Sequence, residues 1–222
     1  MELINGMVIR SMSELESKIA KKKLFFLIKR IGDILLTGIG MVFLLPFFLL
    51  FALLIYIDSP GPVLFKQIRV GKNGKEFYMY KLRSMCMDAE AKLEALLQQN
   101  EIEGAMFKMK DDPRVTKIGK LIRKTSIDEF PQLWNVFKGD MSLIGPRPPL
   151  PREVAEYTEH DKQRLLVTPG CTGLWQVSGR NNVSFHRMVE LDLEYIEKAS
   201  VFKDIKIMLK TIGVLFGAED AF

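Results

Sequence analysis

Two acidic residues, Asp128 and Glu129, stand side by side in the stretch TSIDEFPQLWNVFKGDMSLIGPRPP, residues 125–149. Pro131 follows two residues later, and proline is tolerated in the first turn of a helix but not further in. A helix is therefore predicted to begin within a few residues before Pro131. Both carboxylates would lie beside the unpaired amides and the positive dipole end of that helix, a place that keeps a carboxylate ionised and attracts phosphate.

The acidic pair also has a purely structural interpretation, because Ser126-x-x-Glu129 fits a capping box in which the carboxylate only completes a helix cap. Nearby arginines favour a chemical role. Arg123 precedes the pair, Arg147 is flanked by prolines in GPRPP, and Arg180 lies in the glycine-rich stretch TPGCTGLWQVSGRN. The prolines reduce the entropy that the backbone around Arg147 loses on binding. Arginines that converge on two carboxylates would form either a salt-bridge network or a site for a diphosphate beside an anionic nucleophile.

The composition is that of a folded chain with one strongly basic region. Of its 222 residues 27% are charged and 48% hydrophobic, which excludes a wholly disordered chain. Residues 21–83 hold 11 Lys and Arg and three acids, a local charge of +8 within a total of +5. These cations flank the most hydrophobic segment, which indicates anionic lipid as the partner and not nucleic acid. Cys86 and Cys171 lie far apart in the sequence and are expected to be reduced cytosolic thiols.

The hydrophobic segment, Ile34 to Ile57, has 24 residues without a charge, more than the ~20 that cross a bilayer. It starts too late and is too long for a cleavable signal peptide, and a buried helix of a soluble protein is seldom apolar all round over this length. Pro46 at its midpoint opposes a straight helix. Both flanks are basic, so the positive-inside rule does not assign the two ends to opposite sides. We predict a re-entrant helix–break–helix over residues 24–58, with a proline-kinked spanning helix as the alternative.

The remaining segments predict an α+β fold that is mainly helical. Val63–Val70 and Glu76–Leu82 alternate as strands around an Asn-Gly turn and predict a β-hairpin. Helices are expected over residues 87–99 and 115–124. A C-terminal helix over residues 201–216 has an apolar face that either packs on the core or lies on a membrane surface.

The predicted organisation is an N-terminal extension (1–23), the re-entrant membrane helix (24–58) and a cytoplasmic catalytic domain that ends in the amphipathic helix (59–222). Four long motifs run through it: KRIGD, DSPGPVLFKQIRVGKNGKEFYMYKLRSM, DPRVTKIGKLIRKTSIDEFPQLWNVFKGDMSLIGPRP and TPGCTGLWQVSGRN. Through these motifs, over about residues 24–216, the chain resembles the bacterial sugar transferases. These are the monotopic phosphoglycosyl transferases that begin glycoconjugate assembly. The charged motif positions all agree, whereas the membrane proline follows Leu45 in place of the serine of some members.

The resemblance implies a reaction. Asp128 would attack the β-phosphorus of a UDP-sugar, release UMP and hold the phosphosugar as an acyl phosphate. Undecaprenyl phosphate would then accept the phosphosugar. Glu129, beside Asp128, matches the family's Mg²⁺ ligand, and a divalent cation with arginines would offset the repulsion between a carboxylate and a diphosphate. Mg²⁺ usually takes only one or two carboxylates plus substrate phosphates, which suits so sparse a set of ligands.

The resemblance also implies residues that bind substrate and residues that meet the membrane. Those expected to contact phosphate or nucleotide are Arg123, Arg147, Arg180 and Lys81. Those expected to set the start of the chain against lipid headgroups are Lys29, Arg30, Asp33 and Pro46. The enzyme would lie on the cytoplasmic face of the bacterial inner membrane, and relatives make a homodimer an expectation.

Two other classes of function compete with this interpretation. A catalytically silent membrane scaffold of the same fold would be marked by loss of Asp128, Glu129 or Arg147, and all three are present. A soluble nucleic-acid-binding protein is opposed by the uncharged segment. The connection that begins MDAEAKLEALLQQ resembles that of transferases of galactose 1-phosphate or glucose 1-phosphate, so one of these hexoses is the expected sugar.

Overall fold

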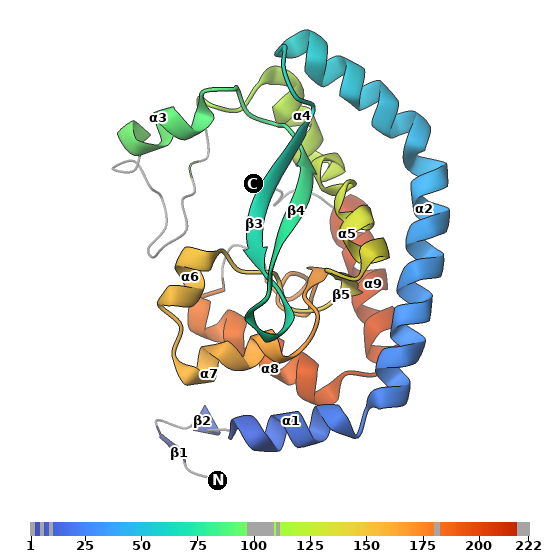
Figure 1. Cartoon of the computed structure of the whole chain (residues 1–222), viewed down its shortest axis with the longest axis vertical. Helices are drawn as coiled ribbons and strands as arrows, with labels where there is room; N and C mark the ends of the chain where they lie inside the picture. Colours follow the sequence, from blue (N-terminus) through green and yellow to red (C-terminus); the bar gives the residue numbers. More distant parts are fainter. Residues whose placement is uncertain are drawn as a thin grey trace.

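The computed structural model describes residues 3–4, 7–8, 11–96, 109, 112–179 and 183–216. Within these ranges the chain is α+β and mainly helical, as predicted (Figure 1). Its helices are α1 (Met12–Ala20), α2 (Lys23–Asp58), α3 (Ala89–Leu96), α4 (Lys117–Lys124), α5 (Gln132–Lys138), α6 (Pro151–Ala155), α7 (Glu159–Lys162), α8 (Phe185–Lys198) and α9 (Val201–Phe216). Its strands are β1 (Leu3–Ile4), β2 (Met7–Val8), β3 (Leu64–Val70), β4 (Glu76–Leu82), β5 (Ser142–Ile144) and β6 (Gly170–Thr172).

The predicted hairpin is present as the antiparallel pair β3–β4, with Leu64 opposite Leu82 and Val70 opposite Glu76. The predicted Asn-Gly turn is also confirmed, because Asn73 (φ 57°) and Gly74 (φ 77°) both have the positive φ that such turns need. A second pair, β5–β6, is parallel and joins two segments 25 residues apart in the sequence. Its strands are only three residues long, so the loops that leave them lie close together.

Helix α2 dominates the outline of the molecule. It has 36 residues, which corresponds to about 54 Å. The predicted break at Pro46 is wrong in one respect: the chain stays helical through the proline, and α2 instead bends over the top of the molecule (Figure 1). Proline removes one backbone hydrogen bond and kinks a helix, but the turns on both sides hold their own bonds.

The apolar stretch of α2 indicates association with a membrane. It is long and apolar enough to cross one, and only 6% of its most hydrophobic window is buried within the described structure. Its large side chains, such as Val42, Phe43 and Leu53, are more than half exposed. A buried helix of a soluble protein would hide such residues, so this alternative is wrong.

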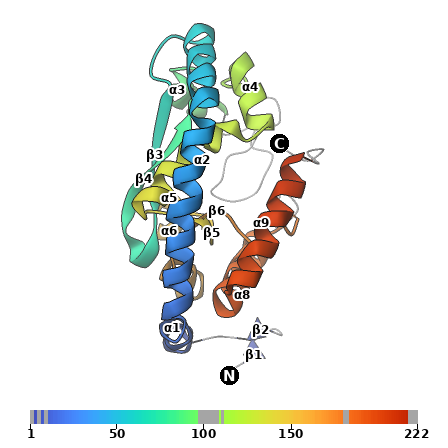
Figure 2. The same cartoon turned by 90° about the vertical axis from the view of Figure 1, so that its right-hand side faces the viewer.

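The core of the remaining chain is built around α8. Leu15 of α1, Ile144 of β5 and Val189 and Leu193 of α8 form its main cluster. Part of the segment predicted as an N-terminal extension therefore belongs to this core. In the side view of Figure 2, α2 runs between the β3–β4 hairpin on one side and α9 on the other.

The C-terminal helix α9 does not bury the apolar face that the sequence marks out. Phe202 is 77% exposed, and Ile205 and Leu209 are also exposed. Ile207, which is not part of that face, is buried in the core, and Met208 is the member of the face that packs against the core. Of the two alternatives, packing on the core holds for Met208 alone, and the rest of the apolar face is exposed and open to a membrane surface.

Candidate active site

The acidic pair lies in a short connection between two helices. After α4 ends, Ser126 adopts a left-handed conformation (φ 55°), and residues Ile127–Glu129 form a single 3-10 turn. Helix α5 begins only after Pro131, so the predicted helix start is a few residues too early. In the described structure the Ser126 side chain makes no capping hydrogen bond, because its reversed backbone turns it away from the next amides. The capping-box interpretation is therefore wrong.

The Asp128 side chain lies at the base of this turn and is only 8% exposed. Burial raises the pKa of Asp128 above its ordinary value, with the neighbouring Glu129 charge acting in the same direction. The cations of Lys81 and Arg123 act to lower this pKa but do not outweigh burial. The expectation that the helix end favours the ionised form of Asp128 is corrected in direction: the net shift of its pKa is upward, because loss of hydration is the larger effect.

Glu129 differs from its neighbour in both exposure and charge environment. Its side chain is 42% exposed, and Oε1 accepts a hydrogen bond of 2.7 Å from Lys81 Nζ. Burial acts to raise the pKa of Glu129, but Lys81 outweighs it with help from Arg147 and Gln132, and the pKa lies below its ordinary value. Glu129 is thus an ionised carboxylate that remains accessible.

Lys81 lies beside Glu129 because α5 is hydrogen-bonded to β4, the strand that carries Lys81. The fully buried Asn135 of α5 donates to Tyr78 O (2.7 Å) and accepts from Tyr80 N (3.1 Å). Its amide thus completes the edge of the strand that carries Lys81. Sequence reasoning missed Asn135, because only the tertiary contact distinguishes it from any polar residue in a helix.

The two carboxylates fit Mg²⁺ when substrate phosphates complete the ligand set. Among the described residues, no group of three or more His, Cys, Asp or Glu could hold a metal by itself. One accessible ionised carboxylate with a second beside it is the sparse oxygen set that Mg²⁺ commonly uses with phosphates. Glu129 is the better ligand of the two, because its carboxylate is ionised and half exposed.

Arg147 is presented by the loop that follows β5. Its side chain is exposed, and its charge reaches Glu129, whose pKa it lowers. The loop backbone is fixed by close contact with the loop around β6: a Cβ on Gly170 would come within 2.1 Å of Gly145 N. Only glycine allows this approach, which explains why the GPRPP and TPGCTG motifs need their glycines.

A third cation, Arg69, belongs to the same region and was missed by the sequence analysis. It is 6% exposed and donates to Pro148 O at 3.0 Å and to the Gln67 side chain at 2.7 Å. Burial, reinforced by the charge of Arg147, lowers the pKa of Arg69 to about 10. Its contact with Pro148 holds the loop of Arg147 in place. The alternation of β3, which puts Gln67 and Arg69 on one face, was the available signal.

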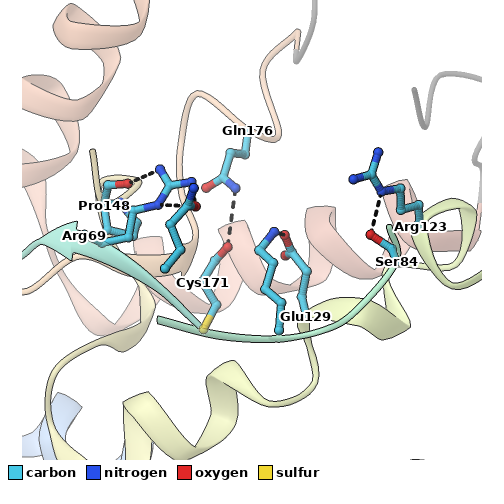
Figure 3. Close-up of polar contacts among 9 residues, drawn as sticks. Arg69, Ser84, Arg123, Glu129, Pro148, Cys171 and Gln176 are labelled. Carbon is cyan, nitrogen blue, oxygen red and sulfur yellow. Dashed lines mark hydrogen bonds and ion pairs between the residues drawn. The ribbon is translucent and has the colours of Figure 1, made fainter. Parts of the chain in front are cut away.

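Arg123 closes the other side of the site. Its Nε donates to Ser84 Oγ at 2.8 Å, while the guanidinium remains exposed. Figure 3 shows Arg69 and Arg123 on opposite sides of Glu129. The structure thus gathers the predicted residues Lys81, Arg123 and Arg147 around the acidic pair. Arg180 lies outside the described residues, so its predicted role stays a prediction.

Comparison with known proteins shows the family of the chain. Residues 24–218 match the family described as "Bacterial sugar transferase", which is most of the chain. The chain belongs to this family.

Several relatives of this sugar transferase have more specific names. It is 49% identical over 200 residues to the "Galactosyl transferase CpsE" of Streptococcus agalactiae serotype III (strain NEM316), covering 90% of this chain and 43% of that protein. It is 40% identical over 212 residues to the "Undecaprenyl-phosphate galactose phosphotransferase" of Salmonella typhimurium (strain LT2), covering 94% and 44%. The "Exopolysaccharide production protein ExoY" of Rhizobium meliloti (strain 1021) is 39% identical, with 83% of each chain covered. The chain spans less than half the length of the first two relatives.

The residues of this sugar transferase that were expected against lipid headgroups instead face its own catalytic domain. Lys29 Nζ lies 2.6 Å from Asp204 Oδ2 in an ion pair that is nearly buried. Arg30 donates to backbone carbonyls of α5, and the buried Asp33 accepts from Leu143 N at 3.1 Å. A buried charge needs a fixed partner, and the catalytic domain supplies one where headgroups would not. The KRIGD motif therefore docks α2 onto the domain, and Pro46 remains as the bend in the exposed part.

Proposed function

We propose that this chain transfers a sugar 1-phosphate from a UDP-sugar to undecaprenyl phosphate and releases UMP. This would be the first membrane step in the synthesis of a polysaccharide or related glycoconjugate. The observation that carries the proposal is the pairing of a buried Asp128 with an accessible, ionised Glu129 inside a ring of cations. The names of the relatives give the class of donor and acceptor.

Asp128 is the proposed nucleophile. One of its carboxylate oxygens attacks the β-phosphorus of the UDP-sugar, the bond from that phosphorus to the bridging oxygen breaks, and UMP leaves with the electron pair. A phosphate oxygen of undecaprenyl phosphate then attacks the same phosphorus and frees the carboxylate. A carboxylate that has lost much of its hydration has less water to shed before it attacks.

The surrounding charges make the approach of two anions feasible. Glu129 would hold Mg²⁺, which when bound offsets the negative charge of the diphosphate. Lys81 keeps Glu129 ionised, and Arg147 offers a planar fork that suits phosphate oxygens better than an ammonium group. Arg123 and Arg180 are the remaining proposed contacts to phosphate or nucleotide.

The test is a reaction of the purified chain with Mg²⁺, undecaprenyl phosphate and a panel of UDP-galactose, UDP-glucose and UDP-N-acetylgalactosamine. UMP should appear with one member of the panel, and a hexose is expected. Intact-protein mass spectrometry with donor but no acceptor should show the added mass of one phosphosugar. Release of UDP would instead indicate transfer of the sugar alone, and UMP without any mass shift would exclude the covalent step.

We also propose that α2 enters and leaves the membrane on the cytoplasmic side. Support comes from contacts near the two ends of α2: Arg30 binds α5, and Asp58 binds α4. Because α4 and α5 belong to one domain, both ends of α2 lie on the side of the membrane where that domain lies. The test is Asn5→Cys in a background without Cys86 and Cys171, treated in intact cells with a membrane-impermeant thiol reagent. Protection until lysis is expected, whereas labelling before lysis would mean that α2 spans the membrane.

A further inference from the structure

The segment that carries the acidic pair, residues 117–138, is held at both of its ends by side chains of α2. It consists of α4, the 3-10 turn and α5, and it will be called the dyad segment. We infer that α2 positions Asp128 and Glu129 for the reaction, with Asp58 and Arg30 as the positioning residues. The catalytic part of this inference rests on the proposed function.

Asp58, the last residue of α2, holds the beginning of the dyad segment. Its Oδ2 accepts a hydrogen bond of 3.0 Å from the backbone N–H of Ile118, in the first turn of α4. The first amides of a helix lack intrahelical partners, and a negative charge there is favoured by the helix dipole. Thr116 caps the same turn through Gly119 N, so Asp58 adds a tether to α2 and not merely a cap.

Arg30 holds the other end of the dyad segment. Its two terminal nitrogens donate to Val136 O at 2.5 Å and to Phe137 O at 2.7 Å, both in the last turn of α5. Val136 O also accepts from the C-cap Gly139 N at 3.0 Å, so Arg30 adds a second donor there, and the cation complements the negative end of the helix. One planar guanidinium thus fixes both the position and the direction of the end of α5.

Apolar contacts fill the space between the two tethers. Beyond Pro46, Ile55 packs with Ile122 of α4, and the cluster extends to Ile127, the residue directly before Asp128. Before Pro46, a Cβ on Gly40 would lie 3.6 Å from Leu133 of α5, an ordinary van der Waals distance. The dyad segment therefore follows α2 on both sides of the proline.

The bend of α2 sets the distance between these tethers. Figure 1 shows α4 and α5 on the inner side of the curve, with α2 passing around them. The dyad segment itself is two short helices, α4 and α5, joined by the left-handed Ser126 and a single 3-10 turn. Such a segment has little stiffness of its own. A change in either tether should move the carboxylates relative to Arg147, which sits on a different loop.

The first experiment compares Asp58→Ala with Asp58→Asn in the full chain reconstituted in lipid nanodiscs. The alanine variant should raise amide hydrogen exchange in residues 117–130 and lower kcat by about tenfold to a hundredfold. KM for the UDP-sugar should change less than kcat, because Arg147 is untouched. Asparagine keeps an acceptor oxygen and should restore both properties. Unchanged exchange, unchanged kcat, or an asparagine variant as impaired as the alanine variant would each overturn the inference.

The second experiment uses two neighbours on α2 that hold different parts of the domain. Arg30→Ala should raise exchange in residues 130–138, whereas Lys29→Ala, which removes the ion pair to α9, should raise it around Asp204. Equal effects of both variants on the dyad segment would mean general loosening and would overturn the inference. The exchange measurements remain decisive even if the unmodified chain releases no UMP, so failure of the proposed function is recognised separately.

Discussion

The acidic and the basic halves of the active site are built in opposite ways. The dyad segment is two short helices with a left-handed Ser126 between them. Side chains of α2 hold it from outside, and its own Asn135 bonds to β4. The loop of Arg147 is held by its own backbone, which lies so close to the β6 loop that a Cβ on Gly170 would meet Gly145 N at 2.1 Å. Side-chain tethers can adjust by small shifts, whereas a backbone contact that leaves no room for a Cβ cannot.

This difference suggests a division of roles. The arginine loop is a fixed surface for the diphosphate, and the carboxylates are the part whose place depends on distant contacts. Substitutions in the acidic half should therefore change the rate while the fold survives. Substitutions in the backbone of the basic half should damage the fold itself.

The largest effect is expected from Asp128→Asn, which separates chemistry from folding in the acidic half. An amide is no nucleophile here, so UMP release should fall by more than about a thousandfold. Removing a buried carboxylate whose pKa is raised by burial should not destabilise the fold. UMP release would be measured together with thermal unfolding, and normal turnover would exclude Asp128 as the nucleophile.

Gly170→Ala tests the basic half. The added methyl group must displace the backbone of Gly145 and Ile144, so the fold should lose on the order of 3 kcal/mol or more. The midpoint of thermal unfolding should fall by roughly 10 °C. Gly213→Ala in α9 is the matched control, because a Cβ there meets only open space in the described structure. Equal stability of the two variants would contradict the rigid contact between the loops.

Arg147→Lys tests the basic half without disturbing its backbone. The charge is kept but the planar fork is lost, so kcat/KM for the UDP-sugar should fall by about tenfold to a hundredfold at unchanged thermal stability. Steady-state kinetics and thermal unfolding give the two readouts. Unchanged kinetics with a lower unfolding midpoint would instead assign Arg147 to a structural salt bridge.

Lys81→Met should give the smallest effect, a shift in the acid limb of the pH–rate profile. The pKa of Asp128 is raised by burial and lowered by Lys81, so loss of the ammonium raises it further. A nucleophile must be ionised, so activity should be lost at a higher pH than in the unmodified chain, by about one unit or less. Lys162→Met removes an exposed ion pair with Glu159 and serves as control. An acid limb of the pH–rate profile that does not move, or that moves to lower pH, would contradict the effect of Lys81 on the pKa of Asp128.

Much of the fold was available from sequence because it depends on local chemistry. The β3–β4 hairpin follows from strand alternation around Asn73-Gly74, and the exposed α2 follows from 24 uncharged residues. The acidic pair was correctly predicted to lie next to the start of a helix, because a proline that follows two carboxylates is tolerated only in a first turn. The detailed geometry of the pair was not predicted, because the left-handed backbone at Ser126 removes the capping box that the spacing predicts.

The sequence by itself determined which residues carry charge, which segment is apolar enough to cross a membrane, and the bounds of α2, α3, α4 and α9 to within a few residues. It did not predict α8, the helix around which the core is built. Only the tertiary structure decided where the charges point. The motif residues Lys29, Arg30 and Asp33 were expected against lipid headgroups, yet they contact α9, α5 and β5. Lys81 meets Glu129 across 48 residues. The physical reason is that a buried charge goes to the partner that satisfies it, and such partners come from elements far apart in the chain.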